Sequence, residues 1–214
     1  MSRLDELTKS LVAQYTQQLS EQEQIDLAEC LQVLADDQKY NKFGNFFPDT
    51  GEYRRKLYKK HIAFFAAGAD YLERAFVAGN RVGKSEAGAY ETTCHLTGEY
   101  PDWWEGRRYD RPILAWIGGD TATTCRDIIQ KKLLGEINDQ GSGMLPKDSI
   151  VECKTRRNVP DAIETIRVRH KSGGVSTAVL KTYEQGRATW QGAEVDWIWV
   201  DEECPEDVYN EGMI

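Results

Sequence analysis

Residues 78–85 of the 214-residue chain read Ala-Gly-Asn-Arg-Val-Gly-Lys-Ser, and they give the strongest indication of its fold class. It matches a phosphate-binding pattern in which a glycine-rich turn joins a strand to a helix, except that alanine stands at the first glycine position. Gly83 permits backbone amides to approach a phosphate, Lys84 would neutralise phosphate charge, and the Ser85 hydroxyl would bind Mg²⁺. The alternative is an ordinary turn with an exposed lysine. The pattern predicts a nucleotide site formed by Ala78, Gly79, Asn80, Arg81, Val82, Gly83, Lys84 and Ser85.

The sequence on either side of this turn alternates between strand and helix patterns. The apolar run 75–78 predicts a strand before the turn, and residues 84–97 have the apolar spacing of a helix after it. Strands separated by helices predict an α/β domain with a mainly parallel sheet flanked by helices. The further elements that we expect are a helix over 54–67, strands over 113–117 and 195–200, an antiparallel hairpin of 163–169 with 175–183, a helix capped by Asp120 and running through Leu134, and a surface loop over 137–150.

A second motif follows the last predicted strand. Residues 197–200 read Trp-Ile-Trp-Val and run directly into Asp201 and Glu202. A carboxylate at the end of a buried strand can hold Mg²⁺ beside a phosphate-binding loop, so Asp201 is the candidate metal ligand. Glu202 could accept a proton from a hydrolytic water, and the acidic pair therefore favours hydrolysis. Taken alone, the acidic run would more simply be the solvated start of a helix.

The first forty residues have a different pattern. Apolar positions recur at helical spacing over residues 3–37 and predict two amphipathic helices, the second beginning near residue 21 after a Ser20–Glu23 capping box. Residues 40–53 are rich in turn-forming and aromatic residues, which is typical of a connection. We therefore expect an N-terminal helical segment over 1–40 and the α/β domain over 41–214.

The composition excludes several classes of protein. The 27 basic and 35 acidic residues give a net charge of −8, which argues against a domain that wraps nucleic acid through its overall field. The 5 cysteines form no CxxC motif and the 3 histidines are scattered, so neither a zinc site nor a disulfide framework is indicated. No apolar run approaches the length of a membrane span, and the chain is expected to be cytosolic.

Four runs together resemble a known family. They are AGNRVGKSEAGAYETTCHLTGEYP (78–101), ILAWIGGDTATT (113–124), TYEQGRATWQG (182–192) and WIWVDEECP (197–205). In order and approximate spacing they resemble the ATPase domain of tailed-bacteriophage terminase large subunits, particularly those of short-tailed, headful-packaging phages. The resemblance implies a P-loop NTPase of the ASCE type that binds ATP and Mg²⁺, with the family's nucleotide-binding lysine and serine at Lys84 and Ser85. The family's metal-binding aspartate and catalytic glutamate fall on Asp201 and Glu202.

The resemblance also implies roles for residues outside the two motifs. Adenine recognition in such motors uses an aromatic residue and a glutamine upstream of the loop, and the matching positions are Tyr58 and His61, where histidine replaces the glutamine. Arg81 and Arg187 are the candidates for arginines that stabilise charge on the transferring phosphate. The simpler interpretations are an ordinary half-buried helix residue for His61 and a surface arginine for Arg187.

The family works as a motor that threads double-stranded viral DNA into a procapsid. By resemblance the expected partners are that DNA, the portal protein, the small terminase subunit and further copies of the chain in a ring, in the host cytoplasm and transiently at the portal vertex. The family continues beyond the acidic strand with further strands and a nuclease domain, so we expect a fold truncated after that strand, with weak or no turnover by this chain alone. The alternatives are a helicase-like nucleic-acid ATPase and a non-hydrolysing nucleotide-binding or partner-binding module that works through residues 3–37.

Overall fold

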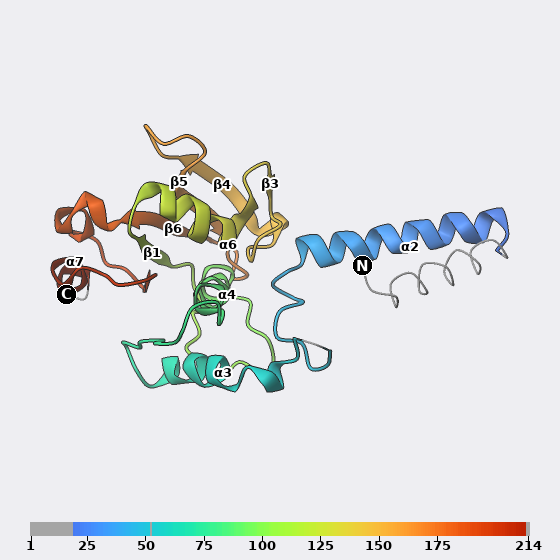
Figure 1. Cartoon of the computed structure of the whole chain (residues 1–214), viewed down its shortest axis with the longest axis horizontal. Helices are drawn as coiled ribbons and strands as arrows, with labels where there is room; N and C mark the ends of the chain where they lie inside the picture. The colour runs from blue at the N-terminus through green and yellow to red at the C-terminus, as the bar shows by residue number, and fades with distance from the viewer. Residues whose placement is uncertain (1–18, 52, 213–214) are drawn as a thin grey trace. The chain divides into compact units, whose positions relative to one another are not determined.

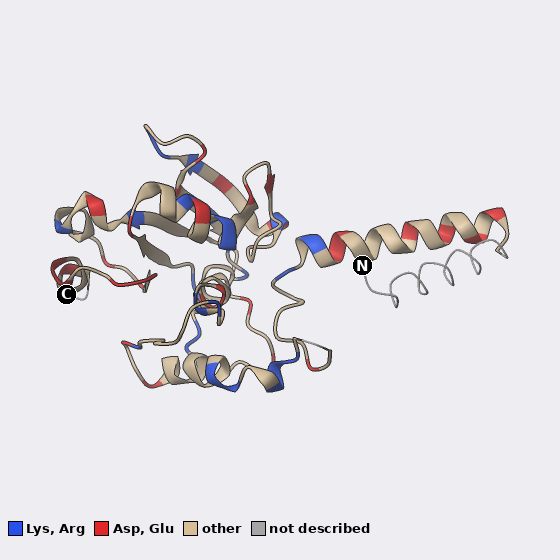
Figure 2. Ribbon diagram, in the orientation of Figure 1, with Lys and Arg blue, Asp and Glu red and all other residues tan. Residues whose placement is uncertain are grey.

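The computed structural model describes residues 19–51 and 53–212, and the chain divides between Lys39 and Tyr40 into two compact units. In the first unit, helix α2 (Glu21–Tyr40) begins where the capping box was predicted, because Glu23 accepts hydrogen bonds from the Ser20 amide and hydroxyl at 2.8 and 2.7 Å. None of its residues is buried. Acidic residues are spread along the helix, and a basic residue, Lys39, lies in its last turn (Figure 2). The helix predicted in the first part of 3–37 lies largely outside the described residues.

A five-stranded sheet organises the second unit, in the order β4-β5-β6-β1-β7 (Figure 1). β1 pairs in parallel with β6 and β7, whereas β4 with β5 and β5 with β6 are antiparallel. The sheet is therefore mixed, and the prediction of a mainly parallel sheet holds only in part: the β1 pairings are parallel, whereas the predicted hairpin and β4 on its outer edge add antiparallel pairings. The strands are β1 (Leu114–Gly119), β4 (Ile150–Thr155), β5 (Ile163–Arg169), β6 (Val175–Thr182) and β7 (Trp197–Val200), with a separate short pair, β2 (Gly135–Glu136) and β3 (Asp139–Gln140).

Helices pack on the sheet and beside it. The helix predicted over 84–97 is confirmed as α4 (Lys84–Thr97). A second helical stretch, expected to be capped by Asp120, is capped instead by Thr121, whose side chain accepts the Thr124 amide at 3.1 Å. The helices not yet named are η1 (Arg55–Leu57), α3 (Lys59–Ala66), η2 (Ala67–Ala69), α5 (Ala122–Thr124), the π-helical η3 (Cys125–Gln130), α6 (Lys131–Leu134), η4 (Lys147–Ser149), η5 (Tyr183–Gln185), η6 (Arg187–Trp190) and α7 (Glu206–Gly212).

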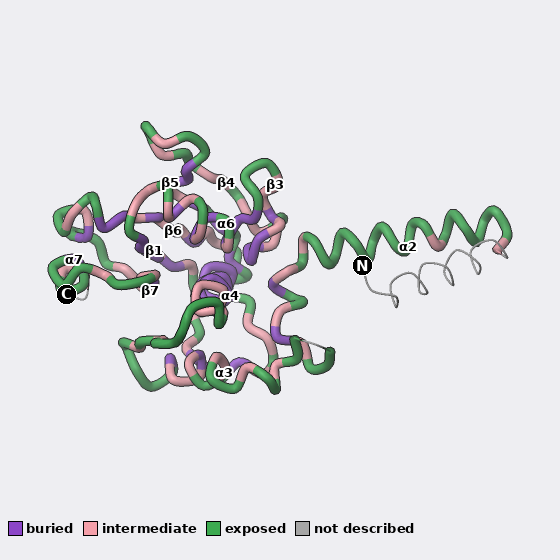
Figure 3. Tube along the Cα trace, in the orientation of Figure 1, coloured by how far each residue is buried: buried purple, intermediate pink, exposed green. Residues whose placement is uncertain are grey.

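The core is centred on α4. Nearly every residue from Ala87 to Thr97 is buried, as the continuous purple helix in Figure 3 shows. On β7, Trp197 and Trp199 face α4: the Trp197 indole donates to Thr92 at 2.9 Å, and the Trp199 ring lies against Gly88. The opposite face of the sheet packs a smaller cluster that includes Trp116, Tyr183, Trp190 and Val208. Strand β7 is thus held between the two clusters, which fixes the position of its carboxyl end.

Two further predictions are corrected. Residues 75–78 form no strand: the sheet ends at β7, and these residues pair with none of the described strands. The predicted surface loop over 137–150 is partly core, since Met144 and Leu145 are fully buried. Their amides bond to the carbonyls of Lys132 and Leu133 at 2.9 and 2.8 Å, which draws the loop onto α6. Apolar side chains there outweigh the turn-forming composition around them.

Candidate functional site

The turn of residues 78–85, called here the 78–85 loop, leads directly into the first turn of α4. Gly83 has a φ of 87° and Arg81 a φ of 61°, so the backbone twice enters the left-handed region before the helix begins. Gly83 satisfies this at no steric cost. A Cβ added at Gly79 would meet nothing within 4 Å, so the loop faces open space there. The result is an accessible turn at the N-terminus of a fourteen-residue helix, a setting that favours an anion.

The Lys84 side chain folds back over this loop. Its ammonium donates to the carbonyls of Ala78 and Gly79 at 2.7 and 2.8 Å. An ammonium has three protons, so one donor remains after these two bonds. The positive charge is therefore held against the 78–85 loop and not extended into solvent.

Ser85 and Asp201 meet although they are 116 positions apart in the sequence. The Ser85 hydroxyl lies 3.1 and 3.0 Å from the two Asp201 carboxylate oxygens and donates to them. The Asp201 backbone is fixed as well: its amide donates to Gly118 at 2.9 Å, and its carbonyl accepts the Tyr183 hydroxyl at 2.9 Å. The sequence reasoning missed Tyr183, whose position beside Asp201 follows from β6 and β7 flanking β1 and could not be inferred from local pattern.

The electrostatics of Asp201 favour a nearby cation. Burial raises the pKa of its carboxyl, and the charge of Glu202 adds to that effect. The Ser85 hydrogen bond and the Lys84 charge lower the pKa but do not cancel the rise. An ionised carboxylate at this position is thus incompletely compensated by the chain itself.

Glu202 adopts an unusual backbone conformation at the end of β7. Its φ is 64°, which is uncommon for a residue other than glycine, and its side chain is exposed. The left-handed turn changes the direction of the chain immediately after Asp201. Backbone conformations of this kind concentrate at functional sites because surrounding structure must hold them.

His61 lies beside the 78–85 loop, and Tyr58 lies against His61. Their ring centroids are 5.5 Å apart, and the His61 ring also meets Phe76, in the segment leading to the loop, at 4.9 Å. His61 Nε2 is 3.1 Å from the Val82 carbonyl; because a carbonyl only accepts, this nitrogen carries the proton. Burial lowers the pKa of His61, and the hydrogen bond to Val82 opposes that effect only in part. The neutral ring is therefore favoured.

The two candidate arginines differ in placement. Arg81 lies within the 78–85 loop and is exposed. Arg187 begins η6 and is also exposed, and in the described part of the chain its side chain forms no hydrogen bond or ion pair with Lys84, Ser85 or Asp201. The fold thus brings His61 and Asp201 to the loop, with Tyr58 against His61 and Glu202 next to Asp201 in sequence, and leaves Arg187 outside these contacts.

The residues present fit a magnesium ion that carries most of its own ligands. Within residues 19–51 and 53–212 there is no cluster of three or more His, Cys, Asp or Glu side chains suited to a metal. Mg²⁺ commonly binds through one or two protein oxygens and completes its shell with waters and phosphate oxygens. The Ser85 hydroxyl and the Asp201 carboxylate form such a pair of oxygen donors.

Comparison with known proteins identifies relatives of the chain. The family model described as "Terminase large subunit, T4likevirus-type, N-terminal" matches residues 75–214. The chain is also 37% identical over 215 residues to the "Terminase, large subunit" of Salmonella phage P22, a match that covers 91% of this chain and 41% of that protein. The chain therefore spans less than half the length of this relative. No solved structure matches it significantly. No helix in the described part of the chain is both long and apolar enough to span a membrane.

Proposed function

The chain belongs to the terminase large subunit family, and from this membership we propose that it forms the ATP-hydrolysing portion of a viral DNA-packaging motor. One observation carries the proposal: the Ser85 hydroxyl bonds to the Asp201 carboxylate across 116 positions of sequence. This contact joins the 78–85 loop, which is suited to a phosphate, to a carboxylate suited to Mg²⁺. Two local motifs that are individually weak thereby become parts of one site.

Each residue of the site has a proposed role. The amides of the 78–85 loop and the Lys84 ammonium would hold the phosphates of ATP, and Ser85 and Asp201 would hold Mg²⁺. When bound, Mg²⁺ supplies positive charge that stabilises the phosphate oxygens during transfer. Glu202, exposed next to Asp201, would orient the hydrolytic water and accept its proton.

Residues around the loop complete the proposal. Tyr58 and His61 would contact the adenine base, which is supported by the hydrogen bond of His61 to the loop carbonyl of Val82. Arg81 would stabilise charge on the transferring phosphate from within the loop. Arg187 is proposed as a second such arginine; its exposure leaves the guanidinium accessible to a nucleotide held by a neighbouring copy of the chain.

The role of the whole protein is proposed from the family. It would use ATP to move double-stranded DNA into a procapsid, as a ring of copies that contacts the portal protein and the small terminase subunit. It would act in the host cytoplasm and transiently at the portal vertex. A non-hydrolysing, partner-binding role is the second candidate, because α2 carries exposed apolar side chains: Ile25, Leu31, Val33 and Leu34.

Titration with a fluorescent ATP analogue tests the nucleotide site. Lys84→Ala should weaken binding strongly, while Lys60→Ala, an exposed lysine of α3, should leave it unchanged. Equal affinity in wild type and Lys84→Ala would refute the site.

Hydrolysis by the whole protein separates the candidate functions. Glu202→Ala should retain nucleotide binding and lose turnover, and normal turnover would remove Glu202 from its role. Turnover stimulated by DNA without any effect of portal protein would favour a helicase-like ATPase. Binding without turnover under every condition would favour the partner-binding module.

A further inference from the structure

The segment that leads into the 78–85 loop is not held by the sheet. Among the described residues, no backbone–backbone hydrogen bond joins residues 72–82 to any other segment. Val77 and Leu72 are 91% and 86% exposed. A loop that must present its amides in a fixed geometry therefore depends on side chains for its position.

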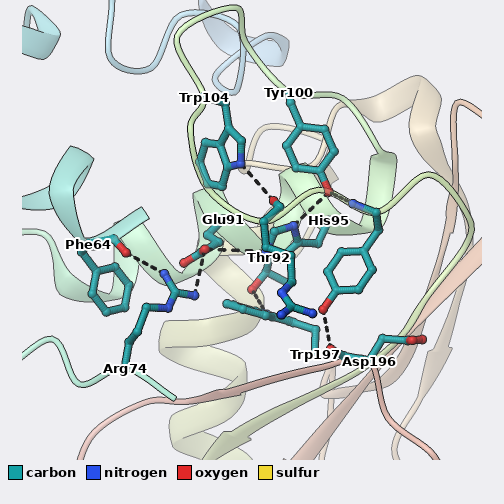
Figure 4. Close-up of polar contacts among 11 residues, drawn as sticks. Phe64, Arg74, Glu91, Thr92, His95, Tyr100, Trp104, Asp196 and Trp197 are labelled. Carbon is teal, nitrogen blue, oxygen red and sulfur yellow. Dashed lines mark hydrogen bonds and ion pairs between the residues drawn. The ribbon is translucent and has the colours of Figure 1, made fainter. Parts of the chain in front are cut away.

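Phe76 of this segment packs against the core, stacking on Phe64, and Arg74 enters it with a charged group (Figure 4). Its guanidinium donates to the Phe64 carbonyl in α3 at 2.6 Å and to Glu91 Oε1 in α4 at 3.0 Å. The side chains of Arg74 and Glu91 are 10% and 1% exposed. Gly68 leaves room for the group, since a Cβ there would lie 2.9 Å from the guanidinium carbon. Arg74 thus ties the segment to both helices at once.

Beside Glu91, two hydrogen bonds orient the ring of His95, which faces the carboxylate. The Tyr109 amide donates to the Tyr100 hydroxyl at 2.8 Å, so the Tyr100 proton is available to His95 Nδ1, which lies 3.0 Å away. His95 Nδ1 then accepts, and the proton of the neutral ring is on Nε2, which faces Glu91 Oε1 at 3.6 Å. Burial lowers the pKa of His95 and keeps the ring neutral. The oriented ring thus places its Nε2 proton toward the carboxylate oxygen that Arg74 binds, at a distance longer than a hydrogen bond.

The same face of α4 also holds the strand that leads to Asp201. Trp197 of β7 donates to Thr92 at 2.9 Å, and its ring lies 4.6 Å from the His95 ring and 5.7 Å from the Arg74 guanidinium. In sequence, Arg74 precedes Ala78 by the same four positions by which Trp197 precedes Asp201. The segment before the 78–85 loop and the strand before Asp201 are thus both anchored to α4, through side chains that contact one another.

We infer that Arg74, Glu91, His95 and Trp197, the Arg74 cluster, set the position of the 78–85 loop relative to Asp201. These are positioning residues, and the inference rests on the proposed nucleotide site. A buried ion pair is often no more stabilising than apolar residues of similar size, so stability alone gives little reason for Arg74 and Glu91 to be charged. Their hydrogen bonds are directional, however, and fix the segment at one point, whereas an apolar contact would let it slide.

The test compares nucleotide affinity with and without Mg²⁺. The measured quantity is the ratio of the dissociation constant of the fluorescent ATP analogue in EDTA to that in Mg²⁺. Asp201→Asn removes the proposed Mg²⁺ ligand, so its ratio is the lowest expected. Replacing the pair together, Arg74→Met with Glu91→Leu, removes both charges and leaves neither one buried without its partner. The ratio should fall by about tenfold or more towards the Asp201→Asn value, as expected when groups that orient metal ligands are removed.

The exposed pair Arg167 and Glu152, 3.2 Å apart on β5 and β4, provides the matched control. Arg167→Met with Glu152→Leu should leave the ratio unchanged, and an equal fall there would overturn the inference. Circular dichroism at the assay temperature verifies folding, and Glu91→Gln, which keeps the side-chain shape, serves if the double variant does not fold.

The outcomes separate the two proposals. A wild-type ratio in the Arg74 and Glu91 variants, alongside a low ratio in Asp201→Asn, would overturn the inference and leave the nucleotide site intact. A wild-type chain that binds no nucleotide, or binds it equally with and without Mg²⁺, would overturn both.

Discussion

Gly88 in α4 should be one of the few helix glycines at which alanine is destabilising. An alanine in a helix interior is normally favoured over glycine by about 1 kcal/mol. Here the added Cβ would lie 2.3 Å from Trp199 Cε2, about 1.1 Å closer than the 3.4 Å at which ordinary contact begins. Trp199 projects from β7 toward α4 and is buried in the core, so its ring cannot move aside freely. Overpacking of this kind costs about 3 kcal/mol.

The net effect of Gly88→Ala is therefore a loss of about 2 kcal/mol from the free energy of unfolding. For a chain of this size the melting temperature should fall by about 4–8 °C. Urea and thermal denaturation, followed by circular dichroism, measure both quantities. The Mg²⁺ effect on nucleotide binding should fall too, because relief of the clash shifts β7 and hence Asp201.

A second variant reverses the sign of the effect. Trp199→Leu removes the ring atoms that the new methyl would strike, so in that background Gly88→Ala should stabilise the chain by about 1 kcal/mol. A Gly88→Ala chain more stable than wild type, or one that is destabilised equally in both backgrounds, would refute the assigned contact between α4 and β7.

Two further predictions concern the site and the end of α4. Asp201→Asn should raise the free energy of unfolding at pH 7: burial raises the pKa of Asp201, so the folded chain binds the proton more tightly and ionisation opposes folding. This gain in stability should vanish as the pH falls to 3.8, the ordinary pKa of aspartate. Urea denaturation at several pH values measures it, and a difference in stability that does not change with pH would contradict the prediction. Gly98→Ala should cost about 3 kcal/mol, because Gly98 has a φ of 71° and a Cβ there would lie 2.3 Å from His170 Nε2. A melting temperature within 1 °C of wild type would exclude that packing, on the scale of about 2–4 °C per kcal/mol.

Local patterns predicted the elements that depend on local sequence. The apolar spacing over 84–97 gave α4 its bounds, and the alternation around the turn at 171–174 predicted the β5–β6 hairpin. The same rules failed at residues 75–78, because a short apolar run becomes a strand only when it pairs with another strand, and these residues pair with none of the described strands. Strand direction across the whole sheet likewise depends on partners distant in sequence, so the mixed order could not be read from any one segment.

The candidate site shows the same division. The two motifs predicted that the loop and Asp201 would approach one another, and Ser85 lies 3.0 Å from the Asp201 carboxylate. Arg74 and Glu91 were missed because a charged pair becomes visible only when the segment before the loop and α4 are seen together. Of the two, Glu91 is the one that local sequence could have indicated, because it is a charged residue in the middle of a helix whose other residues are mostly buried.

Binding of Mn²⁺ in place of Mg²⁺, followed by electron paramagnetic resonance in the presence of ATP, tests the nucleotide site most directly. If Ser85 and Asp201 are the protein ligands, Ser85→Ala and Asp201→Asn should each weaken Mn²⁺ binding by about tenfold or more, while the exposed Arg167→Met should not. Unchanged Mn²⁺ affinity in both site variants would contradict the account, because the ion would then be held elsewhere.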